Sequence, residues 1–180
     1  MGIELLEFVR ISIFRMCEHY LPKLKLALES VDKEVLWKHE KETLNSIGGI
    51  VLHVGSHIQR HVIRYLNSGK IEGGIENHFP DEVATSPSDL IQFITQRFNS
   101  WKEVMIDYTD GNKDEKNLDM FDIYHLVEHT GYHLGQIIDR VQRLTYSNFQ
   151  FVQNGINEKS LKDLIYKDCI RGSWNKPLGE

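Results

Sequence analysis

The stretch FDIYHLVEHTGYHLGQIIDRVQRL, residues 121–144, decides the fold because histidines and apolar residues both repeat in it at helical spacing. His125, His129 and His133 are each four residues apart, so neighbouring members lie one turn above the other on one face of a helix. An earlier stretch, GGIVLHVGSHIQRHVIRYL at residues 48–66, repeats this ladder with His53, His57 and His61. Ladders on two facing helices can supply three imidazole nitrogens to an open metal site. The two stretches therefore predict a divalent metal inside a helical bundle.

Apolar residues at three- and four-residue spacing predict four long helices, at about residues 3–28, 45–67, 86–108 and 118–144. Pro22 falls inside the first helix and should kink or divide it. Ser86, Pro87 and Asp89 are typical of a helix start. The connection between the second and third helices is the longest, which favours a crossover. The expected fold class is all-α, a four-helix bundle with a long crossover between helices 2 and 3.

The 180 residues are interpreted as one domain, with a core at about 3–145 and a C-terminal extension at 146–180. In the extension, residues 145–153 could be extended and residues 159–170 could form a short final helix. The tryptophans Trp37, Trp101 and Trp174 are expected in the core or in a lid.

The composition restricts the class of protein. The chain is 41% hydrophobic and 26% charged, as in ordinary globular domains. A net charge of -5 without a basic stripe argues against nucleic acid and anionic membranes as partners. No apolar run approaches the ~20 residues that a membrane span needs, and the first residues are unlike a signal peptide. Cys17 and Cys169 form no CxxC pair and are typical of a reducing compartment. We expect a cytoplasmic protein with a small-molecule substrate.

The sequence lacks the zinc motif of metalloproteases and the carboxylate–histidine motif of di-iron bundles. Thr130 follows His129 where a metalloprotease HExxH motif would need glutamate. Glu128, the candidate for a Glu-x-x-His pair of di-iron bundles, has Gly131 three residues on. A site with one ion and nitrogen ligands fits better than two ions bridged by carboxylates. This favours zinc or nickel over iron or manganese.

LHVGSH at residues 52–57 and VEHTGYHLGQII at residues 127–138 together resemble the DinB-like (DinB/YfiT) superfamily of metal-binding four-helix bundles. The resemblance extends from residues 45–48 through Gln136. It implies one metal ligand from the second helix and two from the HxxxH of the last long helix, which fall on His53, His129 and His133. It also implies a homodimer.

Periodicity and resemblance disagree about the ligand on the earlier helix. The apolar stripe of Ile47, Ile50 and Val54 lies closer to His57 and His61, so the pattern alone favours one of these two. The resemblance favours His53, and a ligand at the rim of a bundle can keep a coordination position open. His57, His61 and His125 would then line the pocket or fill the core.

The two residues after the histidine pair have structural explanations. Gly135 would allow close helix packing, and Gln136 would form a hydrogen bond within the bundle.

Three histidines leave a coordination position for water or substrate. A metal there can lower the pKa of bound water or hold a thiolate, and the resemblance implies both a hydrolase and a thiol S-transferase. Neither Cys17 nor Cys169 lies in a ligand-like setting, so the transferase would need a low-molecular-weight thiol as a cofactor. The sequence identifies no catalytic acid or base. The alternative to an enzyme is a non-catalytic stress or sensor scaffold that binds the metal.

Overall fold

All regular structure in the described residues, 2–66 and 78–170 of the computed structural model, is helical. The long segments are α1 (Gly2–Phe14) followed by α2 (Leu21–Glu29), α4 (Ile47–Leu66), α5 (Pro87–Thr109) and α6 (Met120–Thr145). These bounds lie within a few residues of those that the apolar spacing predicts. The all-α class is therefore confirmed.

Pro22 divides the first helical segment, as predicted. A six-residue π-helix, η1 (Arg15–Tyr20), lies between α1 and α2, and the backbone N–H of Leu21 bonds the carbonyl of Met16, five residues back. Proline has no N–H, and its ring clashes with the carbonyl four residues before it in a regular helix. The wider π turns let the chain pass this point without breaking.

The third long helix starts where the sequence places it. The Ser86 side chain accepts from the Asp89 backbone N–H, the Asp89 side chain accepts from the Ser86 backbone, and Pro87 occupies the first turn. This reciprocal cap satisfies donors that a helix start leaves unpaired. The apolar stripe that follows is buried along its whole length, at Leu90, Ile94, Phe98, Trp101, Met105 and Tyr108. Burial of such side chains stabilises the fold by roughly 1.5–3 kcal/mol each.

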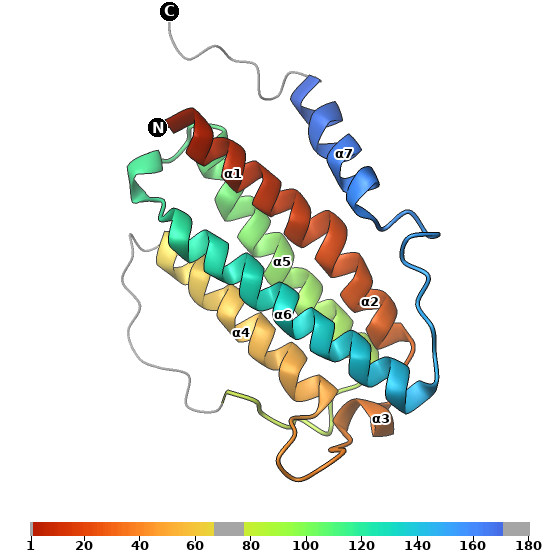
Figure 1. Ribbon diagram of the computed structural model, residues 1–180. Coiled ribbons are helices and arrows are strands. Elements are labelled where there is room, and N and C mark those ends of the chain that lie inside the picture. Colours follow the sequence, from red (N-terminus) through yellow and green to blue (C-terminus); the bar gives the residue numbers. More distant parts are fainter. Residues whose placement is uncertain (1, 67–77, 171–180) are drawn as a thin grey trace, which may run out of the picture.

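The long helices lie side by side, and α5 and α6 each contact both α4 and the α1–α2 segment (Figure 1). In the view of Figure 1, α1 and α6 begin at the upper end, whereas α4 and α5 begin at the lower end near α3 (Lys33–Trp37). Because α4 and α5 run in the same direction, the end of α4 and the start of α5 lie at opposite ends of these helices, as expected for a crossover between them. A residue of α4 therefore has α5 on one side and α6 on the other.

The shorter elements lie at the ends and along one side. α3 begins at an Asp32 cap, in a segment that the sequence presents only as a connection. η2 (Glu115–Asn117) precedes α6, and α7 (Glu158–Ile170) is the expected final helix. α7 lies along α1 and η1 (Figure 1), and Glu158 of α7 pairs with Arg15 of η1.

Several expectations about these peripheral regions can be compared with the structure. Residues 146–155 are irregular or turn, so the extended conformation expected there gives no strand. Trp37 and Trp101 are buried, whereas Trp174 lies outside the described residues. None of the helices within 2–66 and 78–170 combines the length and hydropathy that a membrane span requires.

Candidate metal centre

The start of α4 is tied to the segment at residues 78–82. The backbone N–H of Gly49 bonds the Ser46 hydroxyl at 3.0 Å, which caps the helix. That hydroxyl donates to Asp81 Oδ1 at 2.6 Å, and His39 Nε2 lies 2.8 Å from Asp81 Oδ2. These bonds hold residues 78–82 against the first turns of α4, where His53 lies.

His53 is oriented by this segment. Its side chain is buried, with 5% of the residue exposed. Nδ1 lies 2.8 Å from the carbonyl oxygen of His78, and because a carbonyl only accepts, Nδ1 carries the proton. The ring stacks on Phe79, with centroids 4.3 Å apart. The other nitrogen, Nε2, is left with its lone pair directed toward α6.

His133 on α6 is oriented in the same way by its own helix. Its Nδ1 donates to Gln136 Oε1 at 2.8 Å, and Gln136 Nε2 donates in turn to the Tyr132 hydroxyl at 3.1 Å. Residues three and four apart are neighbours on a helix surface, so this chain of bonds follows from the spacing. Nε2 of His133 is therefore unprotonated and has a free lone pair, as Nε2 of His53 has.

His129 completes the group. Its Nε2 lies 3.1 Å from His53 Nε2, and the ligand atoms of His53, His129 and His133 all lie within 4.8 Å of one another. Tetrahedral bonds of 2.0–2.1 Å place two nitrogens on one zinc about 3.3–3.4 Å apart. One pair is already near that separation, and the widest must close by at most about 1.4 Å. The three side chains thus lie close enough to hold a metal ion.

The chemistry of the donor set fits a divalent cation. The group contains no carboxylate, and two of its imidazoles already present Nε2 as a lone pair. Metal-ligating histidines ordinarily donate their other N–H to a carbonyl or amide oxygen, as His53 and His133 do here. Nδ1 of His129 is buried without a hydrogen-bond partner in the described residues.

The electrostatic environment keeps these imidazoles neutral. Burial, reinforced by neighbouring histidines, lowers the pKa of His53 to about 4 and that of His129 to about 3. Burial also lowers the pKa of His133, although its bond to Gln136 opposes the shift. An imidazole must be neutral to coordinate a metal. The group is therefore ready to bind near neutral pH without first losing protons.

The remaining members of the two ladders lie around this group. The ring of His57 is half-buried, with its centroid 4.1 Å from that of His129 and 4.5 Å from that of His53. His61 is buried, and its Nδ1 has no partner among the described residues. His125 is exposed and stacks parallel to Phe121. Of these three, His57 lies nearest to the group, and the His125 ring lies farther out, with its centroid 5.7 Å from that of His129.

The structure brings together the three histidines that the resemblance implies, rather than the ones nearest the apolar stripe. The reason is the cover at residues 78–82. Residues 50–55 of α4 are all buried, and on the flank where His53 lies the cover comes from Phe79. Helical periodicity detects a helix face but not a loop that folds over its edge.

The roles of the two residues after the pair differ from each other. Gly135 is exposed and has no atom within 4 Å of the position of an added Cβ, so the expectation of close helix packing there is wrong. Gln136 does form the expected hydrogen bond, and its partner is His133. Its contribution to the site, and that of Tyr132, could have been recognised from the i, i+3 and i, i+4 spacing. No spacing in the sequence indicates the contacts that His78 and Phe79 make with His53.

The described cysteine is not part of the group. Cys17 is buried, its Sγ lies 3.9 Å from the Phe98 carbonyl oxygen, and burial raises its pKa to about 12. A thiol that stays protonated is a poor nucleophile and a poor metal ligand. The side chain of Cys169 is not among those that the structure describes.

Comparison with protein-family models, curated proteins and solved structures gave no match to this chain. The resemblance to DinB-like proteins therefore stays a prediction, and the geometry of the histidines carries the functional interpretation.

Proposed function

We propose that the chain binds one divalent metal ion through Nε2 of His53, His129 and His133 and that it is a metal-dependent enzyme. The observation that carries the proposal is the convergence of three neutral imidazoles from two helices, two of them with Nδ1 fixed by hydrogen bonds. Zinc or nickel suits such nitrogen ligands. We further propose that the long helices are a four-helix bundle of the DinB type and that two chains form a homodimer.

Three protein ligands leave a position for a reactant. When bound, the ion would supply Lewis-acid activation of a water or a small thiol at that position. His53 and His133 contribute orientation, because their Nδ1 protons are held by His78 and Gln136. The neighbouring His57 is neutral near pH 7, since burial and adjacent histidines lower its pKa to about 4. Its ring lies 4.1 Å from that of His129, so it would border a reactant held at the ion.

Turnover assays separate the two reactions from the scaffold alternative. Protein loaded with zinc or nickel is screened against ester, amide and electrophile panels, with and without an added low-molecular-weight thiol. A hydrolase turns over without thiol, whereas a thiol transferase requires it. The control is His125→Ala, which changes the same ladder outside the group. Metal binding without metal-dependent turnover in any panel would favour a scaffold.

Sedimentation of the purified chain tests the homodimer independently. We expect twice the mass of one chain, and a single-chain mass at every concentration would contradict that part of the proposal.

A further inference from the structure

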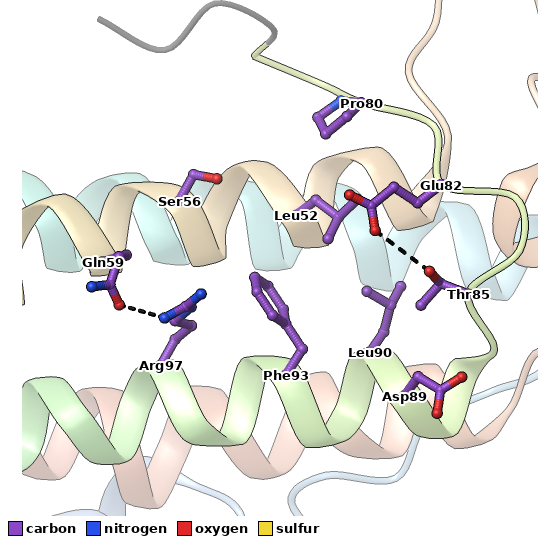
Figure 2. Close-up of a pocket in the computed structure, with 10 residues that line it drawn as sticks. All are labelled: Leu52, Ser56, Gln59, Pro80, Glu82, Thr85, Asp89, Leu90, Phe93 and Arg97. Atoms are coloured by element: carbon purple, nitrogen blue, oxygen red, sulfur yellow. Dashed lines mark hydrogen bonds between the residues drawn. The ribbon is translucent and has the colours of Figure 1, made fainter. Parts of the chain in front are cut away.

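A groove lies between α4 and α5. Its volume is about 470 Å³, within the usual range of small-molecule pockets. Leu52, Ser56 and Gln59 line it from α4, whereas Leu90, Phe93 and Arg97 line it from α5 (Figure 2). The groove contains none of the three clustered histidines.

The middle of the groove is apolar. Figure 2 shows Phe93 and Leu90 facing Leu52 across the space between the helices. A Cβ added at Gly55 would lie 2.4 Å from the Phe93 ring, so this glycine lets the ring rest directly on the α4 backbone. The ring therefore lies against α4 at this point and lines the groove.

The two ends carry opposite charges. Arg97 lies at one end, where its guanidinium stacks over the Phe93 ring at 4.9 Å and Nη1 donates to Gln59 Oε1 at 2.5 Å. Within the described chain Arg97 forms no ion pair, and its Nε is buried without a hydrogen-bond partner. A stacked guanidinium with donors to spare is suited to a carboxylate.

Glu82 and Asp89 lie at the other end, near Thr85 (Figure 2). Hydrogen bonds from Ser86, and to a smaller extent the charge of Lys33, lower the pKa of Asp89, so its carboxylate stays charged. Both of those bonds fall on Oδ2, which leaves Oδ1 for a ligand. Glu82 accepts a long hydrogen bond from the Thr85 hydroxyl at 3.5 Å and forms no ion pair within the described residues. This end favours a cation and repels a second anion.

We propose that the groove binds an elongated zwitterion of short-peptide size, with its carboxylate on Arg97 and its amine between Glu82 and Asp89. Asp89 and Arg97 are eight residues apart on α5, about 12 Å along the helix axis. An extended peptide of about three or four residues spans that length. Its apolar side chain would lie on Leu52, Leu90 and Phe93.

Calorimetric titration with the tripeptide alanyl-leucyl-alanine tests this assignment on the full chain. Arg97→Gln keeps a hydrogen-bonding group beside Gln59 but removes the charge, and we expect affinity to fall at least about ten-fold. Lys102→Gln removes one positive charge from the same helix outside the groove and should bind as the wild type does. Equal affinity of wild type and Arg97→Gln would overturn the proposal.

Two further comparisons keep the test decisive if Arg97→Gln does not fold. The tripeptide with an acetylated amine and an amidated carboxyl should bind wild type at least about ten-fold more weakly than the free form. Glu82 is exposed. Glu82→Gln should weaken binding of the unblocked tripeptide and leave binding of the peptide blocked at both ends unchanged. Equal binding of free and blocked peptides, or no binding of the free peptide up to about 10 mM, would overturn the proposal.

Discussion

The two faces of α4 differ in how their polar and charged side chains are arranged. Toward α6, His53 meets His129 and His133, a set of neutral bases with no carboxylate among them. Toward α5, the groove keeps a guanidinium and two carboxylates at separate ends of an apolar channel. The first arrangement concentrates lone pairs and suits a shared cation. The second separates opposite charges and suits a molecule that carries both.

Both faces depend on the same short segment. His78 and Phe79 contact His53, whereas Pro80 and Glu82 line the groove. The hydrogen bond from Ser46 to Asp81 fixes this segment on α4. The role of a helical polar residue therefore depends on what covers it as well as on the face where it lies.

The largest expected effect is on the histidine face. His129→Ala removes the nitrogen nearest to His53, and we expect affinity for zinc or nickel to fall more than about 100-fold, beyond the usual cost of losing a supporting residue. His125→Ala removes an exposed histidine from the same ladder and should leave affinity unchanged. Calorimetric titration of metal-free protein measures both. Equal losses in the two variants would mean that the ladder, rather than the group of three, binds the ion.

A smaller effect is expected at the residue that orients His133. Gln136→Leu removes the acceptor for Nδ1, so the ring loses its fixed tautomer, and we expect a loss of about 10–100-fold in metal affinity. Gln142→Leu, farther along the same helix, is the matched control. Circular dichroism should show equal helix content in both. If Gln136→Leu binds metal as tightly as Gln142→Leu, the bond to His133 has no role in the site.

Metal-free protein should lose stability in acid. The pKa values of His53, His57 and His61 are lowered to about 4 in the folded chain, compared with about 6.5 when unfolded. The unfolded chain therefore binds more protons between these values, so stability is full above about pH 6.5 and falls as the pH drops toward 4. We expect the free energy of unfolding to decrease by at least about 3 kcal/mol across this window.

Urea unfolding at several pH values checks this slope, and His61→Leu provides the control. His61 is buried with an unpartnered Nδ1, so leucine removes one titrating group and should make the pH dependence shallower. A free energy of unfolding that is constant or rises between about pH 6.5 and 4 would be contrary to burial of neutral imidazoles.

The smallest expected effect is a difference in stability between alanine substitutions at Gly131 and Gly135, the two glycines of the histidine motif. Gly135→Ala is exposed and meets no atom within 4 Å, so it should raise stability by about 0.5–1 kcal/mol through helix propensity. At Gly131 an added Cβ would lie 2.8 Å from the Tyr20 hydroxyl and 3.1 Å from its ring. Gly131→Ala should therefore gain less than Gly135→Ala, by about 1 kcal/mol or more. Thermal unfolding of the two variants measures the difference, and equal gains would show that Tyr20 moves at no cost.

The sequence was sufficient for the long helices because their signals are local, whereas the short helix α3 was not predicted. The cap at Ser86, the division at Pro22 and the apolar stripe of α5 each depend on residues within a few positions of one another. The metal site could be predicted from the sequence only in part. Spacing identified the ladder of His129 and His133, but the choice of His53 depended on a family resemblance, since the contacts from His78 and Phe79 join residues about 25 positions away. The groove left no sequence signal, because its charges come from separate elements.

X-ray absorption of protein loaded with one equivalent of zinc tests the metal centre most directly. We predict one ion per chain, with three imidazole nitrogens at about 2.0–2.1 Å and one further light-atom ligand, and loss of that imidazole signature in His53→Ala. A coordination sphere made of sulfur or of oxygen alone, or an unchanged spectrum in His53→Ala, would contradict the assignment of the ion to His53, His129 and His133.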